Sequence, residues 1–256
     1  MRTPIKPHIS EFKCFRAIQK IIPPNSVVNS FLFFSGEIEF NLAQADRFVV
    51  ARTSNYPIYE FWRCAFDDPG KIMEISRHFY NTLFDEEKIF KLLQTNWASY
   101  KDPFVRAALF FLLNRCSSTG MISSGKFTPN NFNAFALTNL KKFNPQNLYT
   151  WYDEKSTLLG SIDSVDESVD YLLLPVGEYK RNLLEGNYEG SLEETYINHK
   201  HLHQKMSDIT KKWIILYKFH PEAAALYKDY NIIKLNKYGR PTDNNKEAEE
   251  LIIANF

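Results

Sequence analysis

The sequence predicts an α/β protein whose sheet is interrupted by a helical insertion and closed by a C-terminal antiparallel β-hairpin. Short β-rich runs occur toward both ends of the chain, a block of helical periodicity separates them, and two final apolar runs flank a polar loop. The chain has 256 residues, of which 44% are hydrophobic, so it can bury a sizeable core. We therefore expect residues 1–58 and 144–256 to form one α/β domain and residues 59–143 a helical subdomain.

The N-terminal part is expected to hold a short helix and two strands. Apolar residues in 12–22 recur with a spacing near 3.6 and stop at Pro23-Pro24, which predicts a helix that ends there. Residues 27–34 and 47–51 are β-rich. Between them, Ser35-Gly36 interrupts the run and an amphipathic stretch follows. This strand–turn–helix pattern is where α/β enzymes often hold a nucleotide-like cofactor.

The elements that follow are predicted from the same patterns. From residue 59 to about 143 the periodicity is helical throughout. Beyond it we expect strands at 147–152 and 170–177, a helix at 196–209, a strand at 212–219, a helix beginning at Pro221 and a hairpin of 231–236 with 249–256.

Composition limits the classes of function. The 31 basic and 30 acidic residues give a net charge of +1, so any contact with DNA must be local or shared with a partner. Cys14, Cys64 and Cys116 are far apart and form no CxxC pair, so neither a disulfide framework nor a metal site is indicated. There is no cleavable leader pattern and no apolar run of about 18 residues, so we expect an intracellular, cytoplasmic protein with no membrane partner.

Several local matches, in the same order along the chain, resemble the Dam-like class of DNA N6-adenine methyltransferases. The segments SEFKCFRAIQKIIPP, LFFSGEI and VVART are similar to the opening helix, the cofactor turn and the second strand, and keep Lys13, Phe34, Gly36 and Ala51. FLLNRCSSTG is similar to a segment of the family's insertion and keeps Asn114, Arg115 and Gly120. YINHKHL, ALYKDYNIIKLN and EELIIANF are similar to later elements. The resemblance implies a Rossmann-like methyltransferase sheet.

The groups that methyl transfer needs are missing from the matching positions. The family's catalytic Asp-Pro-Pro-Tyr corresponds to a degenerate segment in which Leu174 or Pro175 takes the aspartate position, and neither side chain accepts a hydrogen bond. The segment comprises Leu174, Pro175, Val176, Gly177, Glu178 and Tyr179. On the cofactor side, Leu32, Ile38 and Thr53 replace an acid, a glycine and a carboxylate, and Glu11 replaces a glycine. We therefore expect no cofactor at the relic positions Lys13, Leu32, Phe34, Gly36, Ile38 and Thr53.

The resemblance, with these losses, implies a catalytically inactive homologue. It would be a non-catalytic subunit, associated with nucleic acid, that binds an active DNA adenine methyltransferase, DNA, or both. One alternative is an active S-adenosylmethionine-dependent DNA N6-adenine methyltransferase that uses Glu178 and Tyr179 as a displaced catalytic pair. The other is a structural or inhibitory interaction protein that does not bind DNA.

The insertion and the final hairpin contain polar residues that could contact DNA. Arg115, Lys126, Lys141 and Lys142 of the insertion are candidate contacts to DNA phosphates, with a plain solvated face as the alternative. Ser123 falls where many members of the family carry a DNA-reading arginine. Residues 237–246 are expected to form a polar hairpin loop in preference to a DNA contact.

The histidines and the aromatic residues are expected to have structural roles. His199, His201 and His203 lie in a predicted helix, where residues two apart diverge by about 200°, so we expect a solvated helix start and no metal site. The aromatics that we expect in the core are Phe31, Phe33, Phe34, Tyr59, Phe61 and Trp62. If several of them were exposed together, they would indicate a subunit interface.

Overall fold

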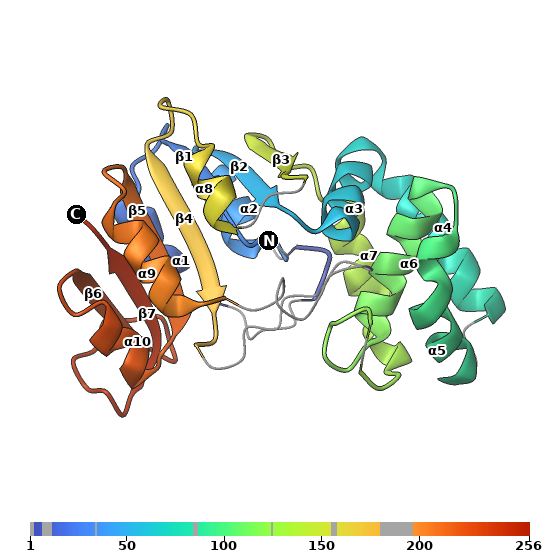
Figure 1. The fold of residues 1–256 in the computed structure, drawn as a ribbon. Coiled ribbons are helices and arrows are strands. Elements are labelled where there is room, and N and C mark those ends of the chain that lie inside the picture. The colour runs from blue at the N-terminus through green and yellow to red at the C-terminus, as the bar shows by residue number, and fades with distance from the viewer. Residues whose placement is uncertain are drawn as a thin grey trace. The chain divides into compact units, whose positions relative to one another are not determined.

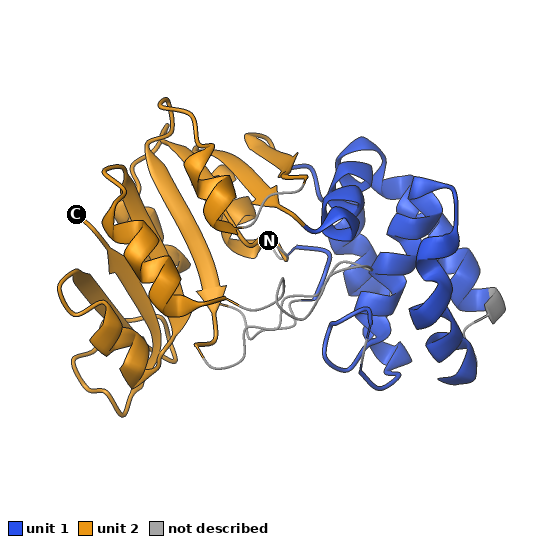
Figure 2. Cartoon of the chain, in the orientation of Figure 1, with its two compact units in different colours: residues 1–10, 55–145 blue, residues 11–54, 146–256 orange. Residues whose placement is uncertain are grey.

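The computed structural model describes residues 3–6, 12–33, 35–83, 87–123, 125–154, 158–179 and 197–256. The chain divides into two compact units, coloured separately in Figure 2: unit 1 is residues 1–10 with 55–145, and unit 2 is residues 11–54 with 146–256. The insertion expected at 59–143 lies within unit 1, and the first ten residues group with that unit instead of with the sheet. Among the helices that the structure describes, none has the length and apolarity that a membrane crossing requires.

Unit 2 contains a mixed seven-stranded sheet with the order β3-β2-β1-β4-β5-β7-β6 (Figure 1). The first five strands in this order are parallel, while β7 is antiparallel to both β5 and β6. The antiparallel C-terminal hairpin is therefore confirmed. The strands are β1 (Val27–Ser30), β2 (Phe48–Thr53), β3 (Leu148–Tyr152), β4 (Tyr171–Gly177), β5 (Lys212–Lys218), β6 (Asn231–Asn236) and β7 (Ala248–Ala254).

Helices cover both faces of the sheet. Figure 1 shows α8, α9 and α10 over one face and α1 and α2 over the other. Their bounds are α1 (Phe15–Ile21), α2 (Glu37–Ala43), α8 (Leu158–Asp163), α9 (His199–Ser207) and α10 (Pro221–Leu226). Pro221 opens α10 as expected, because a proline at the first helical position loses no hydrogen bond. Helix α8 was not expected from the sequence.

The core of unit 2 follows from alternation along its central strands. Leu172, Leu174 and Val176 of β4 point to the face that α9 covers, and Leu173 points to the opposite face; each is at most 1% exposed. A parallel strand buried on both faces is a continuous apolar run, which is why β4 and β5 were predictable. Strand β1 ends at Ser30, earlier than the expected residue 34, because Leu32 adopts a left-handed conformation with φ of 58°.

Unit 1 is helical and is built around α6. Its helices are α3 (Tyr56–Asp67), α4 (Pro69–Leu83), α5 (Glu87–Asn96), α6 (Pro103–Cys116) and α7 (Ala134–Lys141), with single 3₁₀ turns at Trp97–Ser99 and Pro129–Asn131. The Asp102 side chain caps α6 by accepting from the backbone N–H groups of Phe104 and Val105. Residues 107–114 of α6 are all buried, as expected for a helix surrounded by others.

Aromatic rings fill the interior of unit 1. Phe61 stacks on Phe110 with ring centroids 5.1 Å apart, and Trp62 lies 5.0 Å from Phe143. Of the aromatics expected in the core, Phe31, Phe33, Phe61 and Trp62 are at most 1% exposed, which confirms four of them. Tyr59 is only half-buried, because it lies at the rim of α3, and Phe34 lies outside the described residues.

Candidate functional site at the carboxyl edge of the sheet

The place to look for a site follows from the strand order. Strands β1 to β4 are parallel, so their carboxyl ends meet at one edge, and the order reverses at β1, which lies between β2 and β4. In open α/β sheets, ligands bind outside the carboxyl ends at such a reversal. Most of the relic and degenerate positions of the sequence lie on the segments that end here.

The turn between β1 and α2 keeps its glycine but is lined by apolar side chains. Gly36 caps α2 with φ of 66°, a left-handed conformation that favours glycine. Ile38, in the first turn of α2, is 6% exposed and so belongs to the core. The backbone N–H of Lys13 donates to both carboxylate oxygens of Glu250 at 2.9 Å. Glu11, like Phe34, falls outside the described part of the chain.

A buried carboxyl group lies under the same turn and was not singled out from the sequence. Glu39 of α2 is 3% exposed and accepts a hydrogen bond of 2.6 Å from the hydroxyl of Ser30, the last residue of β1. Burial raises the pKa of Glu39, and among the described residues its carboxyl group has no ion-pair partner. The signal in the sequence was a glutamate between Ile38 and Phe40, where both neighbours are core residues.

A buried ion pair occupies the carboxyl ends of β2 and β3. The Arg52 guanidinium donates from Nε and Nη2 to the two carboxylate oxygens of Asp153, at 3.0 and 2.7 Å, and from Nη2 to the Ser164 hydroxyl at 2.7 Å. Its charge also lies 5.6 Å from the ring centre of Phe31, directly after β1. Thr53, the relic position beside Arg52, is 7% exposed. One arginine therefore joins the carboxyl ends of β1, β2 and β3 to the end of α8.

The sequence contained a signal for this pair. An arginine within an otherwise apolar strand must find a carboxylate when it is buried, and Asp153 directly follows the adjacent strand. The partners are 101 residues apart, so only the strand order connects them.

At the end of β4, the position expected for a catalytic aspartate faces the core. Leu174 is fully buried among residues of the α9 face, and Pro175 pairs with Leu216 of β5. A bulge follows, and Gly177 has φ of 87°. The bulge directs Glu178 and Tyr179, both half-buried, past the strand end. Val176, 1% exposed, completes the degenerate segment.

The Tyr179 ring stacks against two histidine rings. Its centroid is 4.3 Å from that of His199 and 5.1 Å from that of His220, with interplanar angles of 20° and 13°. His199 Nδ1 is 2.9 Å from the Tyr217 hydroxyl, and burial lowers the pKa of His199. Two histidine rings of the protein itself therefore contact the tyrosine ring.

This stack corrects the prediction of a solvated helix start. His199 is 6% exposed, because its ring packs on Tyr179 from the end of β4. His203 is half-buried, with its ring 4.9 Å from Tyr227, and only His201 is exposed. Within the described residues no group of three or more His, Cys, Asp or Glu side chains is arranged to hold a metal ion.

In unit 1, two basic side chains, those of Lys6 and Arg115, lie near each other where α6 ends. Asn114 is fully buried and accepts from the Lys6 backbone N–H at 2.7 Å, which fixes residues 3–6 against α6. The Lys6 ammonium donates to the Ser118 carbonyl at 2.7 Å. The pKa of Lys6 is lowered first by burial and then by the charge of Arg115. Lys6 is therefore near Arg115, although the sequence did not indicate it.

The predicted DNA-contacting cations fall into two places. Lys126 is exposed, and its carbonyl accepts from the Ser118 N–H at 2.9 Å, which puts it beside the Lys6 contact. Arg115 Nε donates to the Asn131 carbonyl at 3.3 Å, just before α7 begins. Lys141 and Lys142, both exposed, lie at the other end of α7. A helix of eight residues is about 12 Å long, so this is the distance between the two ends of α7. Ser123 is also exposed.

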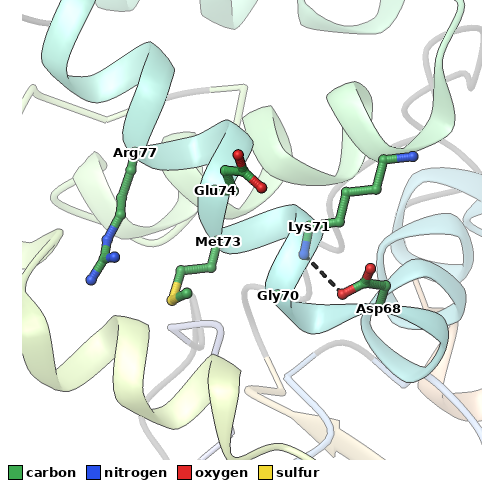
Figure 3. A pocket seen from close by; sticks show the side chains of 6 residues that line it. All are labelled: Asp68, Gly70, Lys71, Met73, Glu74 and Arg77. Carbon is green, nitrogen blue, oxygen red and sulfur yellow. Dashed lines mark hydrogen bonds between the residues drawn. The ribbon is translucent and has the colours of Figure 1, made fainter.

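Unit 1 also has an open hollow of about 710 Å³ at the start of α4. Figure 3 shows its lining residues, Asp68, Gly70, Lys71, Met73, Glu74 and Arg77. The Asp68 carboxylate accepts from the Lys71 backbone N–H at 2.9 Å, as an N-cap does. The charged side chains of the hollow are two acids and two bases, so its chemistry favours no ligand class.

The segment 237–246 forms the loop between β6 and β7, as expected. Gly239 has φ of 70°, and a Cβ there would lie 2.4 Å from the Lys13 carbonyl oxygen, so the loop packs tightly against the segment before α1.

No model of a known protein family matches the chain, and no curated protein is significantly similar to it. The class that the fold defines is therefore an α/β protein with a mixed seven-stranded sheet and a helical unit inserted between β2 and β3.

Proposed function

We propose that this protein is a non-catalytic homologue of DNA N6-adenine methyltransferases that acts as a subunit beside an active one. The architecture supports the proposal. The parallel order β3-β2-β1-β4-β5 is the doubly wound order, and an antiparallel hairpin and a helical insertion complete the arrangement that the resemblance implies. No cofactor is needed for such a role.

The observation that carries the proposal is the state of Tyr179. In the resembled family this aromatic side chain stacks on the target base, and here its ring already stacks against His199 and His220. The aspartate that would hold the amine corresponds to Leu174 or Pro175, and neither side chain can accept a hydrogen bond. A base entering here would meet a ring that already packs against two histidines.

The Arg52–Asp153 pair supports the same conclusion for the methyl donor. A ligand that took Asp153 away from Arg52 would have to break a buried pair, which costs about 3–5 kcal/mol. That is roughly half of the 8 kcal/mol that corresponds to micromolar affinity. We therefore expect S-adenosylmethionine to bind weakly or not at all.

A role in holding DNA rests on the cations of unit 1. Lys6, Arg115 and Lys126 form one group and Lys141 with Lys142 another, and either group could meet phosphates at a net charge of only +1 for the chain. Neither group has features that identify a sequence-reading site. The charge balance favours DNA contact shared with the catalytic subunit.

Isothermal titration with S-adenosylmethionine tests the loss of the cofactor site, with an active adenine methyltransferase as the positive control. We expect no saturable heat at ligand concentrations up to about 1 mM, where a site of that Kd would be half filled. One-to-one binding with a Kd below about 10 µM would overturn the proposal.

A methyl-transfer assay on adenine-containing DNA tests the active alternative, which uses Glu178 and Tyr179. Activity of the purified chain that is lost in Glu178→Gln but kept in a matched surface variant, Glu222→Gln, would establish that alternative. Co-purification from the native host distinguishes the remaining one: a complex without any methyltransferase would favour a structural or inhibitory role. We expect an active methyltransferase in the complex and no activity of this chain alone.

A further inference from the structure

The rings of Tyr179, His199 and His220, here called the Tyr179 stack, bring three separate segments of unit 2 together. Tyr179 follows β4, His199 opens α9, and His220 lies between β5 and α10. The Tyr179 ring centroid is 4.3 Å from that of His199 and 5.1 Å from that of His220, with interplanar angles of 20° and 13°. Two imidazole rings, each nearly parallel to the phenol ring, therefore pack against it.

His220 also caps α10 with its side chain. Its Nδ1 accepts a hydrogen bond of 3.3 Å from the backbone N–H of Glu222, which satisfies one donor of the first helical turn. An imidazole nitrogen accepts only when it carries no proton, so the cap requires an unprotonated Nδ1. A proton there would remove the cap and would place a positive charge at the positive end of the helix dipole. The contact between His220 and α10 therefore belongs to the neutral ring.

His199 is buried in a hydrogen bond with a phenol. Its Nδ1 is 2.9 Å from the hydroxyl of Tyr217 on β5, and the residue is 6% exposed. Burial raises the pKa of the Tyr217 phenol, so this hydroxyl keeps its proton and can donate to a neutral imidazole. A protonated imidazole can only donate, so the two groups would have to exchange roles with a positive charge buried beside them.

The balance of forces on His199 favours the neutral ring. Burial lowers the pKa of His199, and a hydrogen bond with the backbone of Tyr179, the smaller cause, acts in the opposite direction. A charged imidazole would be attracted to the Tyr179 ring, but the lowered pKa means that burial outweighs this attraction. Among the described residues, the titratable side chains next to the stack in the chain or in contact with its members and their partners are Glu178 after β4, Lys200 and His203 of α9, Tyr217 of β5, and Glu222 and Tyr227 of α10.

We propose that the Tyr179 stack is an acid-sensitive contact, which releases the Tyr179 ring when His199 and His220 become protonated. With both imidazoles neutral, the cap on α10, the hydrogen bond to Tyr217 and the stacking are compatible. With both charged, the cap is lost, a charge is buried and two like charges meet at one ring. The stack therefore ties the end of β4 to α9 and α10 at neutral pH and frees it on acidification. This chemistry belongs to unit 2 alone and does not rest on the proposed role beside a methyltransferase.

The expected pH dependence follows from the linkage between protonation and release. The pKa of His199 is lowered while the stack is formed, and it returns toward its ordinary value of 6.5 when the ring is released and solvated. Between these two pKa values, each proton that release takes up raises the equilibrium constant for release about tenfold per pH unit of acidification. The stack is therefore fully favoured above pH 6.5 and weakens as the pH falls below this value. Uptake of a proton by both histidines makes the transition steeper than that of one group.

Nuclear magnetic resonance of the full chain, with ¹³C-labelled tyrosine and histidine rings, tests the release between about pH 7.5 and about pH 5. We expect the Tyr179 ring signals, assigned with Tyr179→Phe, to shift together with those of His199 and His220, along a curve steeper than that of one proton. Circular dichroism over the same range should stay native, because only the stack opens.

Variants of the two histidines test their separate parts. His199→Phe keeps a ring against Tyr179 without a titrating group, and His220→Asn keeps a side-chain acceptor for the cap. Each variant should leave a one-proton transition of the Tyr179 signals, and the double variant should make these signals independent of pH. His201→Gln removes an exposed histidine of the same helix and should reproduce the wild-type curve.

The proposal fails if the Tyr179 signals stay constant while His199 and His220 titrate, or if the double variant keeps the wild-type transition. It also fails if the circular dichroism is lost at the same pH, because the transition would then be unfolding of the whole chain. Circular dichroism at neutral pH shows which variants are folded. The wild-type titration decides the proposal even where a variant does not fold.

Discussion

Replacing Asp153 by alanine would leave the Arg52 guanidinium buried without its carboxylate. The two side chains are only 8% and 6% exposed, and two hydrogen bonds of 3.0 and 2.7 Å join them. Removing one partner of a buried pair costs about 3–5 kcal/mol. Arg52 keeps its bond to Ser164 and its contact with Phe31, so we expect the lower end, a loss of about 3 kcal/mol in the free energy of unfolding.

Urea unfolding followed by circular dichroism measures this loss. The double variant Arg52→Met/Asp153→Leu removes the charge together with its partner, so it should be more stable than Asp153→Ala even though it changes two buried residues. A loss below about 1 kcal/mol for Asp153→Ala, which is the range of exposed ion pairs, would refute the reasoning. The Arg52 side chain would then be solvated, and it would not join the carboxyl ends of β1, β2 and β3.

Three further predictions concern buried polar groups. Burial raises the pKa of Glu39 above its ordinary value of 4.5, so the contribution of Glu39 to stability is full below pH 4.5 and is lost as the pH rises through the raised pKa. The variant Glu39→Gln should therefore be more stable than wild type in urea unfolding at neutral pH. A difference between the two that does not change with pH would contradict this. Burial lowers the pKa of His199 below its ordinary value of 6.5, so the contribution of His199 to stability is present above pH 6.5 and is lost as the pH falls through the lowered pKa. The variant His199→Phe keeps a ring on Tyr179 and should lose less stability than wild type on acidification below pH 6.5. Free energies of unfolding that fall in parallel for the two proteins would count against this. Asn114→Ala should cost about 2–3 kcal/mol and speed hydrogen exchange of the Lys6 backbone amide, whereas unchanged exchange would mean that residues 3–6 are held by other contacts.

The sequence predicted the elements whose signals are local. The apolar runs of β4 and β5 and the hairpin of β6 and β7 were found because burial on both faces, or a polar loop between two runs, is visible within a few residues. Pro221 correctly predicted the start of α10, because its signal is also local. Helix α8 was missed because six residues are too few for a 3.6-residue period to be recognised.

The candidate site depended on contacts between distant residues, and sequence alone could not supply them. Arg52 meets Asp153 only because β2 and β3 are neighbours in the sheet. His199 was expected in solvent, because nothing within α9 indicates that Tyr179, at the end of β4, lies over its ring. Leu174 lies in a run that the sequence predicts as an apolar strand, and the structure shows its side chain buried; that it takes the place of a catalytic aspartate stays a prediction from the resemblance.

The interleaved order of the strands has a consequence for synthesis on the ribosome. β1 (Val27–Ser30) emerges early, but its neighbour β4 (Tyr171–Gly177) follows only after residues 55–145 of unit 1. At about 5–20 residues per second, the nascent β1–β2 pair waits on the order of ten seconds with an open flank, while the helical unit can already collapse around α6. A chaperone that binds the nascent β1–β2 pair during this time should therefore raise the yield of native protein.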